Sequence, residues 1–257
     1  MSVALVTGAS SGIGAVYSRR LAARGYDLVL VARDIERLKA LAAELGKAHG
    51  VNVEVLAADL TDPSQLEKVG ARLRSDPPVD LLVNNAGAAI LGTFESADPA
   101  AMDKLLKLNV GAPTFLASAA IGGMVARGSG AIINIASVVA LVPERFPGIY
   151  SATKSYMLTL SQGLAAEVGP KGVYVQAVLP AATRTEIWER SGADVTQIPG
   201  MMEVDDLVDA ALVGFDRREA VTIPSVPEAA AWEAFEQARF ALSSGFGNAQ
   251  PAARYRV

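Results

Sequence analysis

The chain has 257 residues, 51% of them hydrophobic and 19% charged, with a formal net charge of −4. These values are typical of a folded domain, and the lack of a lysine and arginine cluster argues against nucleic acid as a partner. There is no cysteine and only one histidine, which excludes disulfides and thiol nucleophiles and gives no basis for a metal site. No leader segment and no uninterrupted membrane span is evident, so we expect a cytoplasmic protein without a membrane partner.

Short apolar runs alternate with helical patterns along the whole chain. The runs lack polar alternation, as strands buried on both faces do, and they lie at 3–6, 27–31, 51–57, 79–83, 131–136, 172–179 and 220–223. This order predicts a doubly wound parallel sheet (Rossmann fold) of about seven strands in a single domain over 1–257. A last helix is expected at 227–242 and a loosely held tail at 243–257. Ligands of such sheets bind beyond the carboxyl ends of the strands.

A glycine-rich turn, Thr-Gly-Ala-Ser-Ser-Gly-Ile-Gly at 7–14, joins the first strand to a helix. Glycines allow close approach of the backbone, and the free N–H groups at a helix start favour phosphate. The spacing differs from the commonest dinucleotide fingerprint, and a tight turn needs glycine in any case, so a purely structural role stays open. The candidate phosphate contacts are Gly8, Ser10, Ser11, Gly12, Ile13 and Gly14.

Charged residues follow the second and third strands. Arg33 is placed where a dinucleotide fold holds the adenosine ribose, and a guanidinium there suits a 2′-phosphate, which favours NADP over NAD. The alternative is a solvated loop arginine. Asp34 is expected to cap the next helix. Asp59, followed by Leu60, suits either an adenine amino group or a simple turn.

Polar residues also follow the next strands. Asn85, Ala86 and Gly87 end the fourth strand, where amides and small residues hold the backbone open beside a ligand. Asn109 falls inside a helical region at 99–127, in an apolar stretch where asparagine is unfavourable, and the helix is expected to be interrupted at 109–113. Ser137 ends the fifth strand.

Tyr150 and Lys154 are four residues apart and share one face of a helix. An ammonium group ~5 Å from a phenol, at an effective dielectric of about 20, supplies roughly 3 kcal/mol in favour of the phenolate. That energy is enough to lower a phenol pKa of about 10 by about two units and to make the tyrosine a general acid/base. Taken alone, the pair also fits a surface helix with a solvated lysine.

The segment after the sixth strand carries Pro180, Thr183 and Thr185, and residues 181–203 are predicted to cover the substrate. Apolar residues expected around the substrate favour a medium-sized apolar ketone, while Arg145 or Arg184 would meet any acidic group. These apolar residues are Ile90, Leu91, Val138, Val139, Phe146, Ile187, Trp188 and Met201.

Taken together, these motifs resemble the short-chain dehydrogenase/reductase family over nearly the whole chain. The resemblance is carried by the turn at 7–14, Asn-Asn-Ala-Gly at 84–87, Asn109, and Ser137 placed thirteen residues before Tyr150. It implies that Ser137 orients the carbonyl or alcohol, that Tyr150 exchanges its proton, and that Lys154 lowers the Tyr150 pKa and holds the nicotinamide ribose. It also implies a water relay through Asn109, cofactor contacts from Asp59, Asn85 and 180–185, and a homotetramer or homodimer.

Two features depart from the family pattern. Ala181 stands where the family usually has glycine, and Ser10 and Ser11 stand where members that use NADP often carry a basic residue. The NADP preference therefore depends mainly on Arg33.

The sequence thus predicts an NADP-dependent oxidoreductase that interconverts a ketone and a secondary alcohol. One alternative is a non-catalytic NADP-binding sensor or scaffold on the same fold. A serine hydrolase built on Ser137 or Ser151 is disfavoured, because no histidine lies near either serine and there is no Gly-x-Ser-x-Gly elbow.

Overall fold

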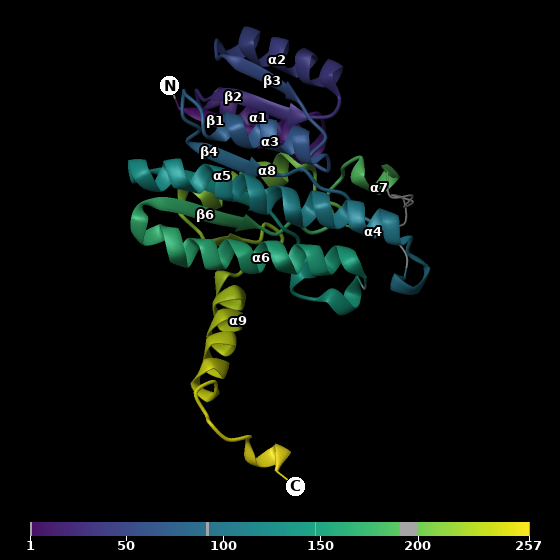
Figure 1. Cartoon of the computed structure of the whole chain (residues 1–257), viewed down its shortest axis with the longest axis vertical. Helices are drawn as coiled ribbons and strands as arrows, with labels where there is room; N and C mark the ends of the chain where they lie inside the picture. Colours follow the sequence, from purple (N-terminus) through teal and green to yellow (C-terminus); the bar gives the residue numbers. More distant parts are fainter. Residues whose placement is uncertain (1, 91–92, 147, 191–199, 257) are drawn as a thin grey trace. The chain divides into compact units, whose positions relative to one another are not determined.

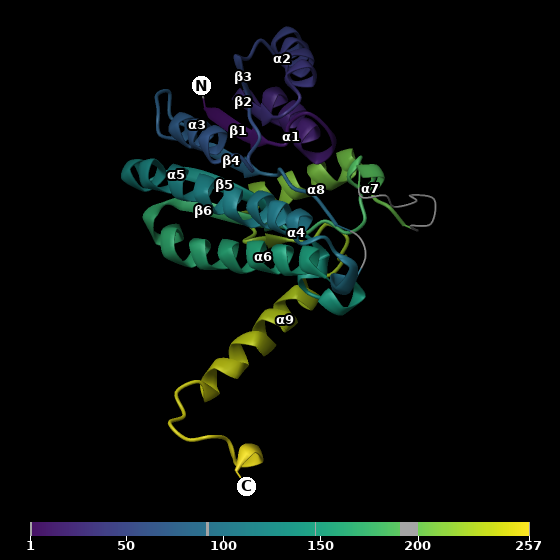
Figure 2. The same cartoon turned by 45° about the vertical axis from the view of Figure 1, so that its right-hand side comes forward.

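The computed structural model describes residues 2–90, 93–146, 148–190 and 200–256. Residues Met1–Pro224 form one compact unit, and Ser225–Val257 form a second. The first unit is a parallel sheet between two layers of helices (Figures 1 and 2). The predicted fold class is therefore confirmed.

All strand pairs in the sheet are parallel, and the strand order is β3-β2-β1-β4-β5-β6-β7. The seven predicted strands are all present, with ends shifted by one or two residues: β1 Val3–Thr7, β2 Asp27–Ala32, β3 Val53–Ala57, β4 Leu81–Asn84, β5 Gly130–Ile135, β6 Val173–Val178 and β7 Val221–Thr222. The chain order reverses between β1 and β4. Ligands of open parallel sheets bind beside such a reversal, beyond the carboxyl ends of the strands.

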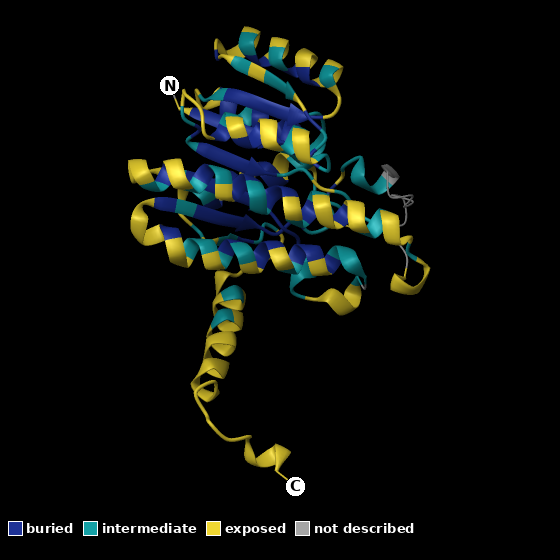
Figure 3. Cartoon of the chain, viewed as in Figure 1, coloured by how far each residue is buried: buried dark blue, intermediate teal, exposed yellow. Residues whose placement is uncertain are grey.

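The helices of the first unit are α1 Gly12–Ala23, α2 Ile35–His49, α3 Pro63–Leu73, α4 Pro99–Leu106, α5 Ala112–Arg127, α6 Ile149–Val168, α7 Ile187–Arg190 and α8 Val204–Asp216. Alternate residues of each strand face opposite layers. Ala4 and Val6 of β1 pack with residues of α1, α2 and α8, whereas Val3 and Leu5 pack with residues of α3 and α5. The central strands are buried on both faces, as Figure 3 shows. This explains why their sequences lack polar alternation.

Local signals set two of the helix starts, the first of them at Asp34, as predicted. The Asp34 side chain accepts a hydrogen bond from the backbone N–H of Arg37 at the start of α2. At the start of α3, Asp62 accepts from Ser64 and Gln65, and Pro63 takes the first helical position. Both helices follow strand ends of the sheet, so these caps also fix the loops that carry Arg33 and Asp59.

The expected interruption near Asn109 is a π-helical turn, Lys107–Gly111, between α4 and α5. Such turns insert an extra residue and often occur at functional sites. Among the described residues, the run Pro99–Arg127 is the one helical stretch long and apolar enough to span a membrane by length and composition. Leu116, Ala120 and Met124 of this run are buried in the core of the first unit, as in an ordinary core helix.

The second unit contains α9 Ala229–Ala241 and two short 3₁₀ turns, Leu242–Gly245 and Ala253–Tyr255. The sequence predicted one domain over 1–257 with a tail from 243. The structure instead separates a unit that begins at Ser225 and includes the last helix. No residue of α9 is buried, although Trp232 and Phe235 stack with ring centroids 5.3 Å apart.

Candidate active site

A cavity of about 690 Å³ lies beyond the carboxyl ends of the strands, where the sequence analysis placed the site. Residues that follow six different strands line it. They include Gly8, Ser10, Ser11, Gly12, Ile13, Arg33, Asp59, Leu60, Asn85, Ala86, Gly87, Ser137, Tyr150, Lys154, Pro180, Thr183 and Thr185. Two predicted site residues, Gly14 and Asn109, do not line the cavity. Both contact residues that do line it.

The glycine-rich turn is held in place by the end of β4. The side-chain amide of Asn85 donates to the carbonyl oxygens of Thr7 at 2.8 Å and Gly8 at 3.3 Å, while the Thr7 hydroxyl accepts from the N–H groups of Asn85 and Ala86 at 3.0 Å each. A Cβ on Gly14 would lie 2.3 Å from the Gly8 oxygen. Gly14 is therefore required for the close approach of α1 to the turn, not for a ligand contact.

The turn has the features of an anion site. Gly8 has a φ of 66°, and a Cβ there would lie 2.7 Å from the Asn85 side-chain nitrogen, so only glycine fits. Ser11 stands at the N-cap of α1 in extended conformation, and its side chain makes no hydrogen bond to the helix N–H groups. The first turn of α1 thus directs its backbone donors and the positive end of its dipole at the cavity.

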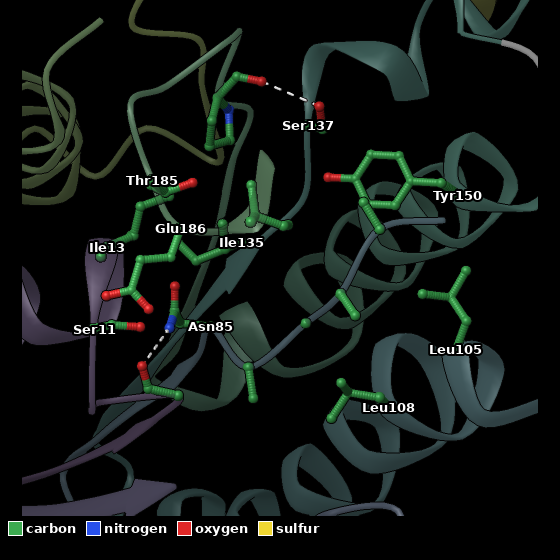
Figure 4. Close-up of a pocket in the computed structure, with 18 of the residues that line it drawn as sticks. Ser11, Ile13, Asn85, Leu105, Leu108, Ile135, Ser137, Tyr150, Thr185 and Glu186 are labelled. Carbon is green, nitrogen blue, oxygen red and sulfur yellow. Dashed lines mark hydrogen bonds between the residues drawn. The ribbon is translucent and has the colours of Figure 1, made fainter. Parts of the chain in front are cut away.

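Ser137 and Tyr150 meet at the opposite end of the cavity (Figure 4). The Ser137 hydroxyl donates to the Pro180 carbonyl at 3.2 Å and accepts from the Val139 N–H at 3.4 Å. Tyr150 lies in the first turn of α6, and its hydroxyl points toward Ser137. Phe146 packs edge-on against the Tyr150 ring, with centroids 5.6 Å apart.

The pKa of Tyr150 is shifted opposite to the sequence prediction. Burial raises the pKa of Tyr150 to about 12, and a hydrogen bond with Ser137 only partly offsets that effect. The prediction that the pKa of Tyr150 lies below the usual value of a phenol is thus wrong for this arrangement, since withdrawal from solvent outweighs the other influences. At neutral pH the Tyr150 phenol keeps its proton and is ready to act as an acid.

Lys154 is buried, with 7% of its surface exposed, and its ammonium donates to the Ile135 carbonyl at 2.8 Å. Burial lowers the pKa of Lys154 to about 8. The Lys154 nitrogen lies 5.7 Å from the centre of the Tyr150 ring. The alternative of a solvated surface lysine is therefore excluded.

Asn109 of the π-helical turn ties three segments together. Its side chain donates to the Ala88 carbonyl at 2.9 Å and to the Thr153 hydroxyl at 3.1 Å, and it accepts from the Ala88 N–H at 3.0 Å. Asn109 therefore joins the loop after β4 to α6, beside Lys154. Its proposed role in a water relay stays a prediction.

The adenosine end of the cavity is rich in charge. The Asp59 carboxylate accepts from the N–H and hydroxyl of Thr61 at 2.9 and 2.7 Å, so it forms the turn that was one of its two interpretations. Burial raises the pKa of Asp59, but the bonds from Thr61 and the charges of Arg33 and Lys104 outweigh burial and hold it below its usual range. Asp59 is thus a carboxylate that faces two cations.

Apolar side chains surround the other end, and six of the predicted substrate contacts line the cavity: Ile90, Val138, Val139, Phe146, Ile187 and Trp188. Leu91 lies outside the described residues, as do residues 191–199 of the predicted cover. Met201 does not line the cavity. Arg145 and Arg184 do not line it either, and Arg184 pairs with Glu203 at 2.8 Å, so neither arginine meets an acidic substrate group here.

Residues 2–196 match the family model of short chain dehydrogenases. The chain belongs to the short-chain dehydrogenase family. Galactitol 2-dehydrogenase (L-tagatose-forming) of Cereibacter sphaeroides is 38% identical to this dehydrogenase over 187 residues, which is 72% of each chain. Relatives of the chain are named dehydrogenases and reductases, so it is an oxidoreductase of this family, as predicted.

Two solved structures of dehydrogenases are similar to this one over its full length. A short-chain dehydrogenase from Sphingobium yanoikuyae in complex with NADPH is 56% identical, with a TM-score of 0.97 and 100% of both chains covered. The bulky-bulky ketone specific alcohol dehydrogenase from Comamonas testosteroni is 47% identical, with a TM-score of 0.93, covering 100% of this chain and 99% of the other.

Sequence analysis missed several residues that this dehydrogenase places at its cavity. Thr7 was included only as part of a motif, although its hydroxyl organises the glycine-rich turn. Lys104, Arg37 and Glu186 line the cavity and carry charge into it, yet all three occupy positions in ordinary helical or loop sequence. Only the folded arrangement brings them to the site.

Proposed function

We propose that the protein is a cytoplasmic NADP-dependent oxidoreductase that interconverts ketones and secondary alcohols, with Tyr150 as the general acid/base. The observation that carries the proposal is the convergence of the Ser137 hydroxyl, the Tyr150 hydroxyl and the Lys154 ammonium at one end of a cavity that extends to Arg33. Similarity over the full chain to a dehydrogenase solved with NADPH supports the choice of cofactor.

The residues present fit NADP. The turn at 8–14 lines the cavity with backbone and packs too closely on Asn85 for a side chain at Gly8 or Gly14, and α1 directs donors at the pyrophosphate position. Arg33 would pair with the 2′-phosphate, and Asp59 and Leu60 would border the adenine. The remaining cofactor contacts would come from Asn85, Ala86, Gly87, Tyr150, Lys154, Pro180, Thr183 and Thr185. When bound, the nicotinamide supplies or accepts the hydride.

The chain's own residues handle the proton. In the reductive direction Tyr150 donates its phenolic proton to the ketone oxygen, while the Ser137 hydroxyl, which donates to the Pro180 carbonyl in this structure, turns its proton to the ketone oxygen and holds it in place. The Lys154 ammonium, 5.7 Å from the ring centre, stabilises the phenolate that forms on Tyr150. Because the pKa of Tyr150 is raised to about 12, neutral pH favours the form of the enzyme that reduces ketones.

The lining of the substrate end favours an apolar ketone over a polyol. Val138, Val139, Phe146, Ile187 and Trp188 present hydrocarbon or aromatic surface there. Similarity to an alcohol dehydrogenase specific for bulky-bulky ketones supports a medium-sized substrate with large groups on both sides of the carbonyl. Galactitol 2-dehydrogenase, a relative named for a polyol, matches 72% of this chain, whereas the ketone-specific enzyme matches all of it.

A steady-state assay with NADPH tests the substrate class. We expect kcat/KM for ketones with two bulky apolar substituents to exceed that for keto-sugars by at least about tenfold, because one buried methylene is worth about 0.8 kcal/mol and several would be buried. Higher activity with keto-sugars would contradict the apolar assignment. NADPH binding without turnover of any ketone would favour the sensor or scaffold alternative.

Replacement of Arg33 by alanine tests the cofactor preference. Loss of a charged hydrogen-bonding partner of phosphate costs about 1.5–3 kcal/mol, so the Michaelis constant for NADPH should rise roughly 10- to 100-fold. The constant for NADH should change little, since NADH has no 2′-phosphate. Equal changes in the Michaelis constants for both cofactors would show that Arg33 does not select for the 2′-phosphate.

We also propose that the chain forms a homodimer or homotetramer, as the family resemblance implies. Large apolar side chains of the second unit are exposed, among them Phe240 at 62% and Phe246 at 79%, and surface of this kind is typical of protein contacts. Sedimentation equilibrium of the full chain should give a mass of two or four chains. A single-chain mass at micromolar concentration would contradict this proposal.

A further inference from the structure

An ion pair links the two sides of the adenosine end of the cavity. Arg37 lies in the first turn of α2, and Glu186 lies directly before α7, 149 residues later in the chain. The Arg37 Nη1 donates to Glu186 Oε1 at 3.0 Å and to Oε2 at 3.1 Å, and both residues line the cavity. Neither residue was assigned a role from the sequence, and the proposed mechanism does not use them.

The Glu186 carboxylate lies on the side of the cavity where an anion of the cofactor would bind. Its side chain reaches toward Ser11 of the glycine-rich turn (Figure 4). The neighbouring Thr185 side chain lies 3.4 Å from the position that a Cβ on Gly12 would take. Because the start of α1 favours an anion, a carboxylate in this position partly takes the place of a phosphate and competes with one.

Arg37 is suited to the same phosphate as Arg33. The two arginines are four residues apart on the segment that follows β2, and both line the cavity. The other charged residues that line this end are Asp34, Asp59, Lys104 and Glu186, and Asp34 lies 3.5 Å from Arg37. A guanidinium binds phosphate with two parallel hydrogen bonds, and a phosphate monoester carries more charge than a single carboxylate.

Breaking the Arg37–Glu186 ion pair costs little stability. Its side chains are 50% and 39% exposed, and exposed ion pairs of this kind contribute little to stability. The backbone of Arg37 is anchored separately, because its N–H donates to the Asp34 side chain at 3.0 Å. The side chain of Arg37 is thus able to change partners while α2 stays in place.

We propose that Arg37 is a second specificity-determining residue for the 2′-phosphate, and that Glu186 holds it until the cofactor binds. This inference rests on the proposed NADP-dependent function. On binding, Arg37 exchanges the Glu186 carboxylate for the 2′-phosphate, and Glu186 withdraws from the glycine-rich turn. Glu186 directly precedes Ile187 and Trp188, which line the substrate end, so the exchange also couples cofactor binding to that wall of the cavity.

Equilibrium binding to the full chain, measured by calorimetry with NADPH and NADH, tests the exchange without relying on activity. Arg37→Ala should weaken NADPH binding by at least about tenfold and change NADH binding by less than about twofold. Glu186→Gln removes the competing charge and should tighten NADPH binding about three- to tenfold. Its effect on NADH should be smaller, since NADH does not recruit Arg37.

Arg19 and Glu44 provide a matched control, because they form a similarly exposed ion pair at 2.7 Å that involves α2 but does not line the cavity. Arg19→Ala and Glu44→Gln should leave the affinities for both nucleotides unchanged. The inference is overturned if Arg37→Ala weakens both nucleotides equally or neither, or if Glu186→Gln weakens NADPH binding. Wild-type protein that binds neither nucleotide would overturn the proposed function itself, and with it this inference.

Discussion

Replacing Tyr150 by phenylalanine is expected to lower kcat for ketone reduction by about 10²- to 10⁴-fold, the usual contribution of a positioned general acid. The phenol, which is the proposed proton donor, points toward Ser137 at the substrate end of the cavity, and phenylalanine keeps the ring that packs on Phe146. The affinity for NADPH should fall by much less than kcat, because most of the proposed cofactor contacts lie elsewhere. Steady-state rates and calorimetric binding measure the two effects separately.

Tyr156 offers a matched control for this variant. It lies on the same helix, its side chain is 40% exposed, and it does not line the cavity. Tyr156→Phe should therefore keep wild-type kcat. If Tyr150→Phe were as active as Tyr156→Phe, the proton would come from another donor.

Replacing Lys154 by methionine is expected to lower kcat/KM by about 100-fold. The Lys154 nitrogen lies 5.7 Å from the centre of the Tyr150 ring, and at about this distance and an effective dielectric of about 20 its charge favours the phenolate by about 3 kcal/mol, or about two units of pKa. Lys39→Met provides the control, since Lys39 is an exposed lysine that pairs with Glu36 outside the cavity.

The pKa of Lys154 predicts that reductive kcat/KM depends on pH. The pKa of Lys154 is lowered to about 8 by burial, so its ammonium is present below pH 8 and is lost as the pH rises through that value. Reductive kcat/KM should therefore be constant below about pH 8 and fall above it. Lys154→Arg keeps its charge at all these pH values and should remove the fall. A wild-type rate that stays constant to pH 10 would show that the charge of Lys154 is not needed.

Local patterns in the sequence were enough to predict the fold and the positions of the central site residues. Short apolar runs predicted the buried strands, Asp34 predicted the start of a helix, and helical spacing predicted that Tyr150 and Lys154 share one face. Each of these features involves residues close together in the chain, and each was found where it was expected.

Features that depend on the folded environment were not predictable in the same way. The direction of the Tyr150 pKa shift is set by burial, which a pair of residue types does not encode. The contact of Arg37 with Glu186 joins residues 149 positions apart. The separation of α9 into a second unit depends on contacts with other elements, which the sequence of the helix does not specify.

We propose that the protein reduces a ketone at the end of the cavity lined by Ser137, Tyr150 and Lys154, with NADPH bound in the same cavity. A single-turnover experiment tests it most directly: the enzyme in excess over NADPH is mixed with a bulky apolar ketone, and nicotinamide absorbance and alcohol product are followed together. We expect loss of the absorbance in one phase, with one alcohol of a single configuration formed per NADPH. Bound NADPH that remains unoxidised with every ketone of the panel would contradict it.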